Sequence, residues 1–209
     1  MAIDDPLDEH EQSERVLLWL RENGAGLIGG IVLGLAAIGG WKWWQQQQSQ
    51  QQLARADQYQ AAINAIEAGD GQGAAKVDGL GEGVYANLAG LELAASQVAA
   101  KDNAAAIETL RSIKSGNAAI ADIVNQRLAR LLIATDQAEA ALALVDTADT
   151  PTALQVRGDA QYALGQPDKA RESYQQALTR LDVASPQRRV LELKLAEVGG
   201  TPTSTEAQS

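Results

Sequence analysis

Few side chains in this sequence could carry out chemistry, because it contains one histidine and no cysteine in 209 residues. Proton transfer, nucleophile activation and metal binding in proteins draw mostly on these two residue types. The histidine, His10, precedes a long apolar segment, so it cannot reach a site in the rest of the chain if that segment spans a membrane. The sequence therefore predicts no catalytic residue, no metal site and no cofactor, and indicates that the protein is not an enzyme.

Two remaining patterns could suggest catalysis. An enzyme that used carboxylates alone would need a deep pocket joining two acids with raised pKa values. The candidates for such a pair are Asp78, Glu82, Glu92 and Asp102. The sequence GLGEG at residues 79–83 resembles a phosphate-binding loop, but no strand precedes it, its spacing is not G-x-G-x-x-G and no Walker lysine follows. A flexible turn is the simpler interpretation.

The most informative element is a run of 18 uncharged residues, GAGLIGGIVLGLAAIGGW, at residues 24–41. About 20 apolar residues in a helix cross the hydrocarbon core of a bilayer. The four tryptophans of the chain fall at or just outside the run, where indole rings favour the membrane interface: Trp19, Trp41, Trp43 and Trp44. No signal-peptide cleavage pattern precedes Trp41. The sequence predicts a single transmembrane helix over residues 23–44.

Gly26, Gly30 and Gly34 recur every four residues in this segment, so a helix aligns them on one face. Such a strip permits close approach by a second transmembrane helix. Glycine is also simply frequent in membrane helices, which is the alternative explanation.

The charge of the chain limits its partners. The formal net charge is -10, and the first 22 residues hold seven of the 27 acidic residues. An acidic surface disfavours nucleic acid as a partner. Charge does not set the membrane orientation, because Arg15 and Arg21 before the apolar run are matched by Lys42 and Arg55 after it. Residues 1–22 are expected to form an acidic tail and a juxtamembrane helix.

Helical patterns account for most of the chain after the apolar run. Residues 45–68 predict a Gln-rich helix leaving the membrane, and residues 69–83, with six glycines, predict a loop without regular structure. Pro151, Pro167 and Pro186 mark helix starts. Residues 199–209 predict a disordered tail. The expected helices cover 84–100, 103–115, 118–135, 137–147, 151–164, 167–182 and 186–198.

These helices fall into similar pairs. The segments VAAKDNAAAIETL, LIATDQAEAALAL and YALGQPDKARESY each contain a helix end, a turn and a small alanine followed four residues later by Leu or Tyr. The alanines are Ala106, Ala140 and Ala170, and their partners are Leu110, Leu144 and Tyr174. The alanine spacing is close to the 34-residue period of a tetratricopeptide repeat. The fold class is therefore predicted as all-α: a transmembrane helix and then a tetratricopeptide-like α-solenoid at residues 84–198, with 186–198 as capping helix.

The third pair resembles the tetratricopeptide family most closely. Gly158 and Ala170 are expected to be small because the two helices of the pair cross there, and Tyr174 is expected to fill the groove beside them. The first two pairs match only in part. An ordinary helical bundle is the alternative fold. A repeat stack presents a concave surface, which favours protein binding over catalysis.

The order of these parts resembles the YfgM-like ancillary subunits of the SecYEG translocon: an acidic tail, HEQSERVLLWLRENG, GLIGGIVLGLAAIGGWKWW, a Gln-rich exit and the repeat domain. The resemblance implies a single-pass bacterial inner-membrane protein with a cytoplasmic N-terminus and a periplasmic repeat domain. It also implies binding to SecYEG and the periplasmic chaperone PpiD, and help for secreted or membrane protein substrates leaving the translocon. The alternative is a membrane-anchored receptor or adaptor whose repeats face the cytosol.

Overall fold

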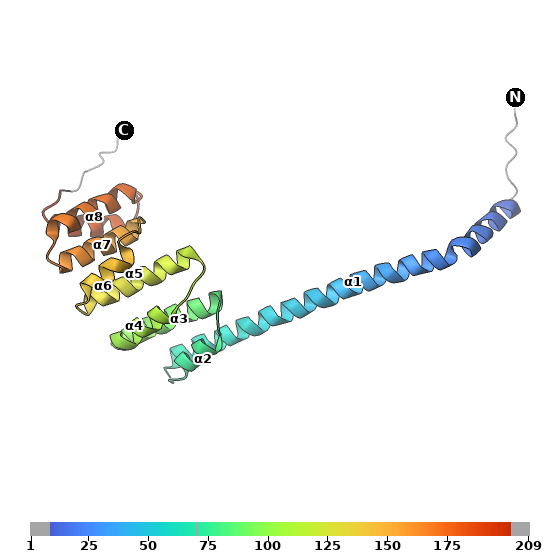
Figure 1. The fold of residues 1–209 in the computed structure, drawn as a ribbon, viewed down its shortest axis with the longest axis horizontal. Coiled ribbons are helices and arrows are strands. Elements are labelled where there is room, and N and C mark those ends of the chain that lie inside the picture. Colours follow the sequence, from blue (N-terminus) through green and yellow to red (C-terminus); the bar gives the residue numbers. More distant parts are fainter. Residues whose placement is uncertain (1–8, 70, 202–209) are drawn as a thin grey trace, which may run out of the picture. The chain divides into compact units, whose positions relative to one another are not determined.

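The computed structural model describes residues 9–69 and 71–201, and all the regular elements in these ranges are α-helices (Figure 1). The chain divides into two compact units, residues 1–54 and 55–209. The predicted all-α class is confirmed. The helices are α1 (Glu9–Ala68), α2 (Gly73–Gly79), α3 (Val84–Ala99), α4 (Asn103–Ser112), α5 (Ala118–Ala134), α6 (Ala138–Val145), α7 (Pro151–Ala163), α8 (Pro167–Arg180) and α9 (Gln187–Glu197).

Helix α1 is continuous across the boundaries predicted at residues 22 and 44. Charged residues and glutamines are acceptable helix formers, so neither flank of the apolar run interrupts the backbone hydrogen bonds. The acidic tail before residue 9 and the predicted disorder after residue 201 lie outside the described residues.

The prediction that residues 69–83 lack regular structure is wrong for residues 73–79, which form α2. The reason is tertiary packing. Gly73 is buried against α1, and a Cβ atom there would lie 3.0 Å from Cγ1 of Ile66. This close approach holds the start of α2 against the end of α1. Gly81 and Gly83, with φ of 67° and 131°, keep the segment after α2 irregular.

The seven helices expected between residues 84 and 198 are all present. The largest difference is at α4, which ends at Ser112 rather than at residue 115, because Ile113 turns to extended backbone. Figure 1 shows the pairs α3/α4, α5/α6 and α7/α8 following one another. Two groups of buried side chains form the core. One runs from α3 to α7, and the other joins α7, α8 and α9.

The three pairs share one turn. Lys101, Asp136 and Gly165 adopt left-handed backbone with φ of 65°, 59° and 70°. In each case the next backbone N–H donates to a carbonyl five residues earlier: Asp102 to Gln97 (2.9 Å), Gln137 to Leu132 (2.8 Å) and Gln166 to Gln161 (2.9 Å). This is the Schellman arrangement. The same geometry follows α9, where Gly199 has φ of 75°. The repeat seen in the sequence is therefore also a repeat of backbone conformation.

The shared turn gives a first prediction. A side chain in left-handed backbone costs about 1 kcal/mol that glycine avoids. Lys101→Gly and Asp136→Gly are therefore each expected to raise the free energy of unfolding by up to about 1 kcal/mol, and Gly165→Ala to lower it by a similar amount. Urea unfolding of the detergent-solubilised chain, followed by circular dichroism, measures these changes.

Gly116→Ala is the matched control, since Gly116 has ordinary backbone and a Cβ there meets no atom within 4 Å. It is expected not to destabilise the fold. Equal destabilisation by Gly116→Ala and Gly165→Ala would contradict a role for the left-handed turn.

Candidate functional site

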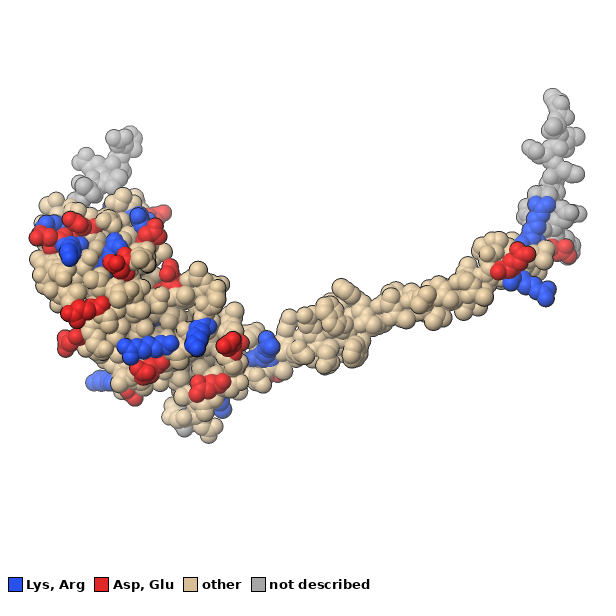
Figure 2. Space-filling view, in the orientation of Figure 1, with Lys and Arg blue, Asp and Glu red and all other residues tan. Residues whose placement is uncertain are grey.

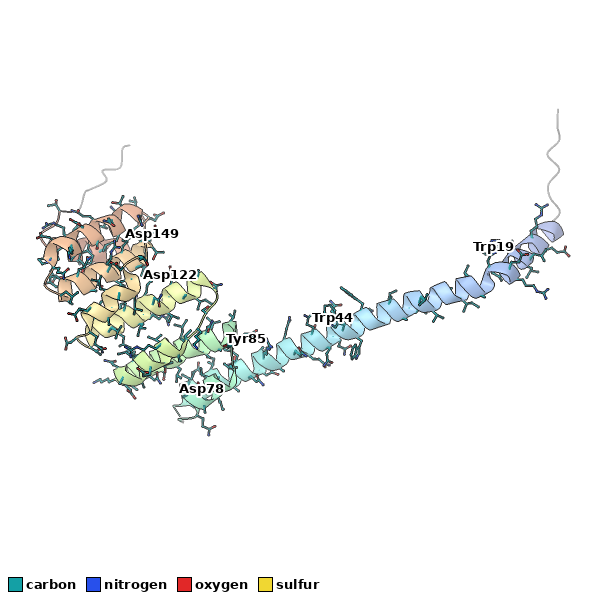
Figure 3. All side chains as sticks on the ribbon, viewed as in Figure 1. Trp19, Trp44, Asp78, Tyr85, Asp122 and Asp149 are labelled. Carbon is teal, nitrogen blue, oxygen red and sulfur yellow. The ribbon has the colours of Figure 1, made fainter. Side chains whose placement is uncertain are left out.

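The apolar part of α1 has the length and composition of a membrane-spanning helix. It contains an 18-residue window with few charged residues. No residue of that window is buried within the structure. Figure 2 shows only uncharged side chains along a long stretch of α1. Trp19 lies before the uncharged run at residues 24–41, and Trp44 lies after it (Figure 3). A helix whose large apolar side chains are all exposed needs an apolar environment, which a bilayer supplies.

The three glycines of the predicted helix-packing strip lie within this part of α1. A Cβ atom added to Gly26, Gly30 or Gly34 would meet nothing within 4 Å. The strip is thus open along its length. A role in packing against another membrane helix stays a prediction.

In each helix pair, the small buried residue lies at a fixed distance from the start of the second helix. Ala106 and Ala170 are fully buried, each at the fourth position of its helix. The prediction that Ala140 is their counterpart is wrong, because Ala140 is exposed and Ala141, the fourth residue of α6, is fully buried. Several alanines begin α6, so residue type alone did not fix the register; packing against α5 does.

The large partners follow four residues after these alanines. Leu110, Val145 and Tyr174 are 3%, 1% and 2% exposed. The predicted partner Leu144 is only half-buried, as expected from the same shift of one residue. In each repeat, a small and a large side chain therefore occupy consecutive turns of the second helix and face the first.

Gly158 and Tyr174 meet where α7 crosses α8. A Cβ atom on Gly158 would lie 2.4 Å from Cε1 of the Tyr174 ring, closer than any real contact. The ring is thus packed directly against the backbone of α7. Only glycine permits this approach.

Polar side chains tie the capping helix α9 to this crossing. The Tyr174 hydroxyl donates to Oδ1 of Asp159 at 2.8 Å, and Nζ of Lys194 donates to both Asp159 oxygens at 2.7 Å. Burial, reinforced by the negative charge of Asp159, raises the pKa of Tyr174. Nearby, the Tyr162 hydroxyl donates to Glu197 at 3.1 Å, and this hydrogen bond raises the pKa of Tyr162. The arrangement joins α7, α8 and α9, a structural role.

Sequence reasoning missed Asp159 and Lys194. They lie 35 positions apart, and neither stands out by type or spacing on its own helix. Only the packing of α9 on α8, in the core that α7 shares, brings them together.

The four acids considered for carboxylate chemistry do not form one site. Asp78 and Glu82 line a cavity of about 280 Å³ that Lys114 also lines. Asp102 caps α4 by accepting the Ala105 N–H at 3.0 Å, and Glu92 is exposed on α3. In the part of the chain that the structure describes, no group of three or more histidine and acidic side chains could hold a metal ion.

A larger cavity, of about 430 Å³, lies between α3 and α5. We call it the α3–α5 groove, and it is lined by Leu91, Ala95, Val98, Leu110, Arg127 and Arg130, among others. It exists because α5 packs closely on α7, whereas its contact with α3 is slight. Small side chains on both walls leave the space unfilled. The sequence did not predict this groove, since helical periodicity does not report how far neighbouring repeats separate.

Comparison with known proteins gives consistent matches. The family described as Tetratricopeptide repeat-like domain matches residues 18–200. A protein of Escherichia coli (strain K12), called Ancillary SecYEG translocon subunit, is 28% identical over 200 residues, covering 90% of this chain and 95% of its own. A protein of the same name from Haemophilus influenzae is 25% identical over 182 residues, covering 82% and 89%. No solved structure gives a significant match.

Proposed function

The chain belongs to the tetratricopeptide repeat-like family, among the YfgM-like proteins, and on this basis we propose that it is a membrane-tethered scaffold that binds proteins beside the Sec translocon. The observation that carries the proposal is the combination of one unburied apolar helix with a stack of helix pairs. The helix suits anchorage in the bacterial inner membrane. The stack suits binding of protein segments.

In this proposal the repeat domain lies in the periplasm and the N-terminus in the cytoplasm. The partners are SecYEG, the chaperone PpiD, and secreted or membrane proteins emerging from the translocon, which the scaffold helps to pass to the chaperone. Tethering confines the repeat domain near the channel, so its effective concentration toward these partners is high. Each contact can then be weak and brief.

The orientation can be tested with single cysteines, because the natural chain has none. Ala140→Cys places a thiol on the exposed surface of α6, and Glu14→Cys places one on the exposed surface of α1 before the apolar run. In intact spheroplasts, a membrane-impermeant maleimide is expected to label Ala140→Cys and to spare Glu14→Cys until the cells are lysed.

The reverse labelling would contradict the periplasmic orientation. It would instead support the alternative, a membrane-anchored receptor or adaptor with its repeats facing the cytosol. Labelling of both thiols in intact spheroplasts would show that the apolar helix does not hold the chain across the membrane.

Partner binding is tested by photo-crosslinking in cells. A photoreactive residue at Leu88 on α3 or Ile123 on α5, both exposed, is expected to recover SecYEG subunits, PpiD or secreted proteins. Glu139, exposed on α6, supplies a control position. If crosslinking from these positions recovers none of the three classes, the scaffold proposal is wrong.

A further inference from the structure

The α3–α5 groove has an unusual charge. The chain carries a formal net charge of -10, yet the groove lining contains Arg127 and Arg130 and no acidic residue. Both arginines are exposed, and within residues 9–69 and 71–201 neither makes an ion pair or a hydrogen bond. By contrast, Arg171, Arg180 and Arg188 each pair with a carboxylate, although Arg189, away from the groove, is also unpaired in the described part of the chain. The groove is thus a local positive site whose charge is not neutralised from within.

Large apolar side chains are also exposed on α3 and α5, the two helices that form the groove. Val84, Leu88 and Val98 are 57%, 41% and 43% exposed on α3, at spacings that place them on one face. Ile123 is 43% exposed on α5, one turn before Arg127. Large apolar side chains left exposed around a cavity indicate a binding surface. Its volume of about 430 Å³ falls in the range of sites that accept side chains or small ligands.

We infer that the α3–α5 groove binds an acidic, apolar segment of a partner protein. The apolar side chains of that segment enter the cavity beside Leu91 and Leu131, and its carboxylates pair with Arg127 and Arg130. Charge complementarity selects this class of segment, because a basic segment would face two unpaired guanidinium groups. The inference rests on the proposed function, and it specifies which protein segments the scaffold takes and where.

The test uses the full chain in nanodiscs and two fluorescein-labelled peptides. One peptide consists of repeats of Glu-Leu-Leu-Glu, and the other has lysine in place of each glutamate. Fluorescence anisotropy is expected to show binding of the acidic peptide, weakening as salt rises, and much weaker binding of the basic peptide. Nanodiscs without protein correct for peptide partitioning into lipid.

Arg127→Glu combined with Arg130→Glu is expected to weaken acidic-peptide binding at least about tenfold. Both side chains are exposed, so the fold should tolerate the change. The matched control is Lys169→Glu with Arg189→Glu, which changes the net charge equally at two exposed, unpaired cations away from the groove. The control should stay within about twofold of the natural chain. Ala95→Trp, which fills the cavity, should also abolish binding.

Equal affinity of the natural chain and the Arg127/Arg130 double variant for the acidic peptide would overturn the inference. So would equal binding of the two peptides. If light scattering instead shows a dimer that only this double variant dissociates, a second copy of the chain covers the groove and the inference is likewise wrong.

The outcomes separate this inference from the proposed function. Peptide binding with the expected arginine dependence, but no crosslinks in cells, would retain the groove and refute the translocon scaffold. Crosslinks in cells without peptide binding would retain the translocon scaffold and refute the inference about the groove.

Discussion

Gly158→Val is expected to lower the free energy of unfolding of the repeat domain by about 3 kcal/mol, the upper part of the range for overpacked cores. A Cβ atom at this position would lie 2.4 Å from the Tyr174 ring. The ring cannot move aside, because it is 2% exposed and its hydroxyl is held by Asp159. Helices α7 and α8 must therefore separate. Circular dichroism during urea unfolding in detergent measures the loss.

A control and a rescue make this result specific. Gly79→Val should change stability by less than about 0.5 kcal/mol, because a Cβ atom on that exposed glycine meets nothing within 4 Å. Gly158→Ala should be tolerated better in a Tyr174→Leu background than in the natural chain, since the smaller side chain leaves room. We expect a coupling of about 1–2 kcal/mol between the two changes. Strictly additive effects would show that the ring and the glycine are not in competition.

Helix positions were predictable from the sequence because their signals are local. Pro151 and Pro167 occupy first helical positions, as expected, and Thr150 caps α7 through the Ala153 N–H. Pro186 falls one position earlier than expected, at the cap of α9. Helix starts depend on neighbouring residues alone, so residue types report them well.

Features that depend on tertiary packing were not predictable in the same way. Ala140 and Ala141 are identical in type, and the packing of α6 against α5 and α7 decides which one is buried. Helix α2 forms in a glycine-rich stretch because Gly73 fits against Ile66. The α3–α5 groove likewise depends on the separation of two helices. The sequence indicated a turn in each pair, but the left-handed backbone at Lys101, which its residue type disfavours, could be recognised only in three dimensions.

Breaking the ion pair between Asp159 and Lys194 is the second change that we expect to lower stability strongly. Asp159→Leu leaves the Lys194 ammonium without its carboxylate in a half-buried position, and Lys194→Met leaves the Asp159 carboxylate without its cation, with the Tyr174 hydroxyl as its remaining partner. We expect each change to cost about 2 kcal/mol, less than for a fully buried pair because both side chains retain some water contact. Hydrogen exchange should accelerate most in α9, which this pair holds against α7.

The double variant Asp159→Leu/Lys194→Met is expected to cost less than the sum of the two single changes, because it leaves no unpaired charge behind. Additive costs would show that the two side chains do not depend on each other.

Alkaline pH tests the same group of side chains through Tyr174. Burial and the charge of Asp159 raise the pKa of Tyr174 above its ordinary value of 10.0, so the folded chain keeps a phenol proton that the unfolded chain releases. The stability that this raised pKa gives the folded chain is fully present below about pH 10. It is lost as the pH rises further, since the unfolded state then binds fewer protons than the folded state. Tyr174→Phe should therefore lose less stability between about pH 9 and pH 11 than the natural chain does. An identical alkaline loss in both chains would mean that Tyr174 ionises as readily in the folded protein as in the unfolded one, and that the contact between α7 and α8 is open to water.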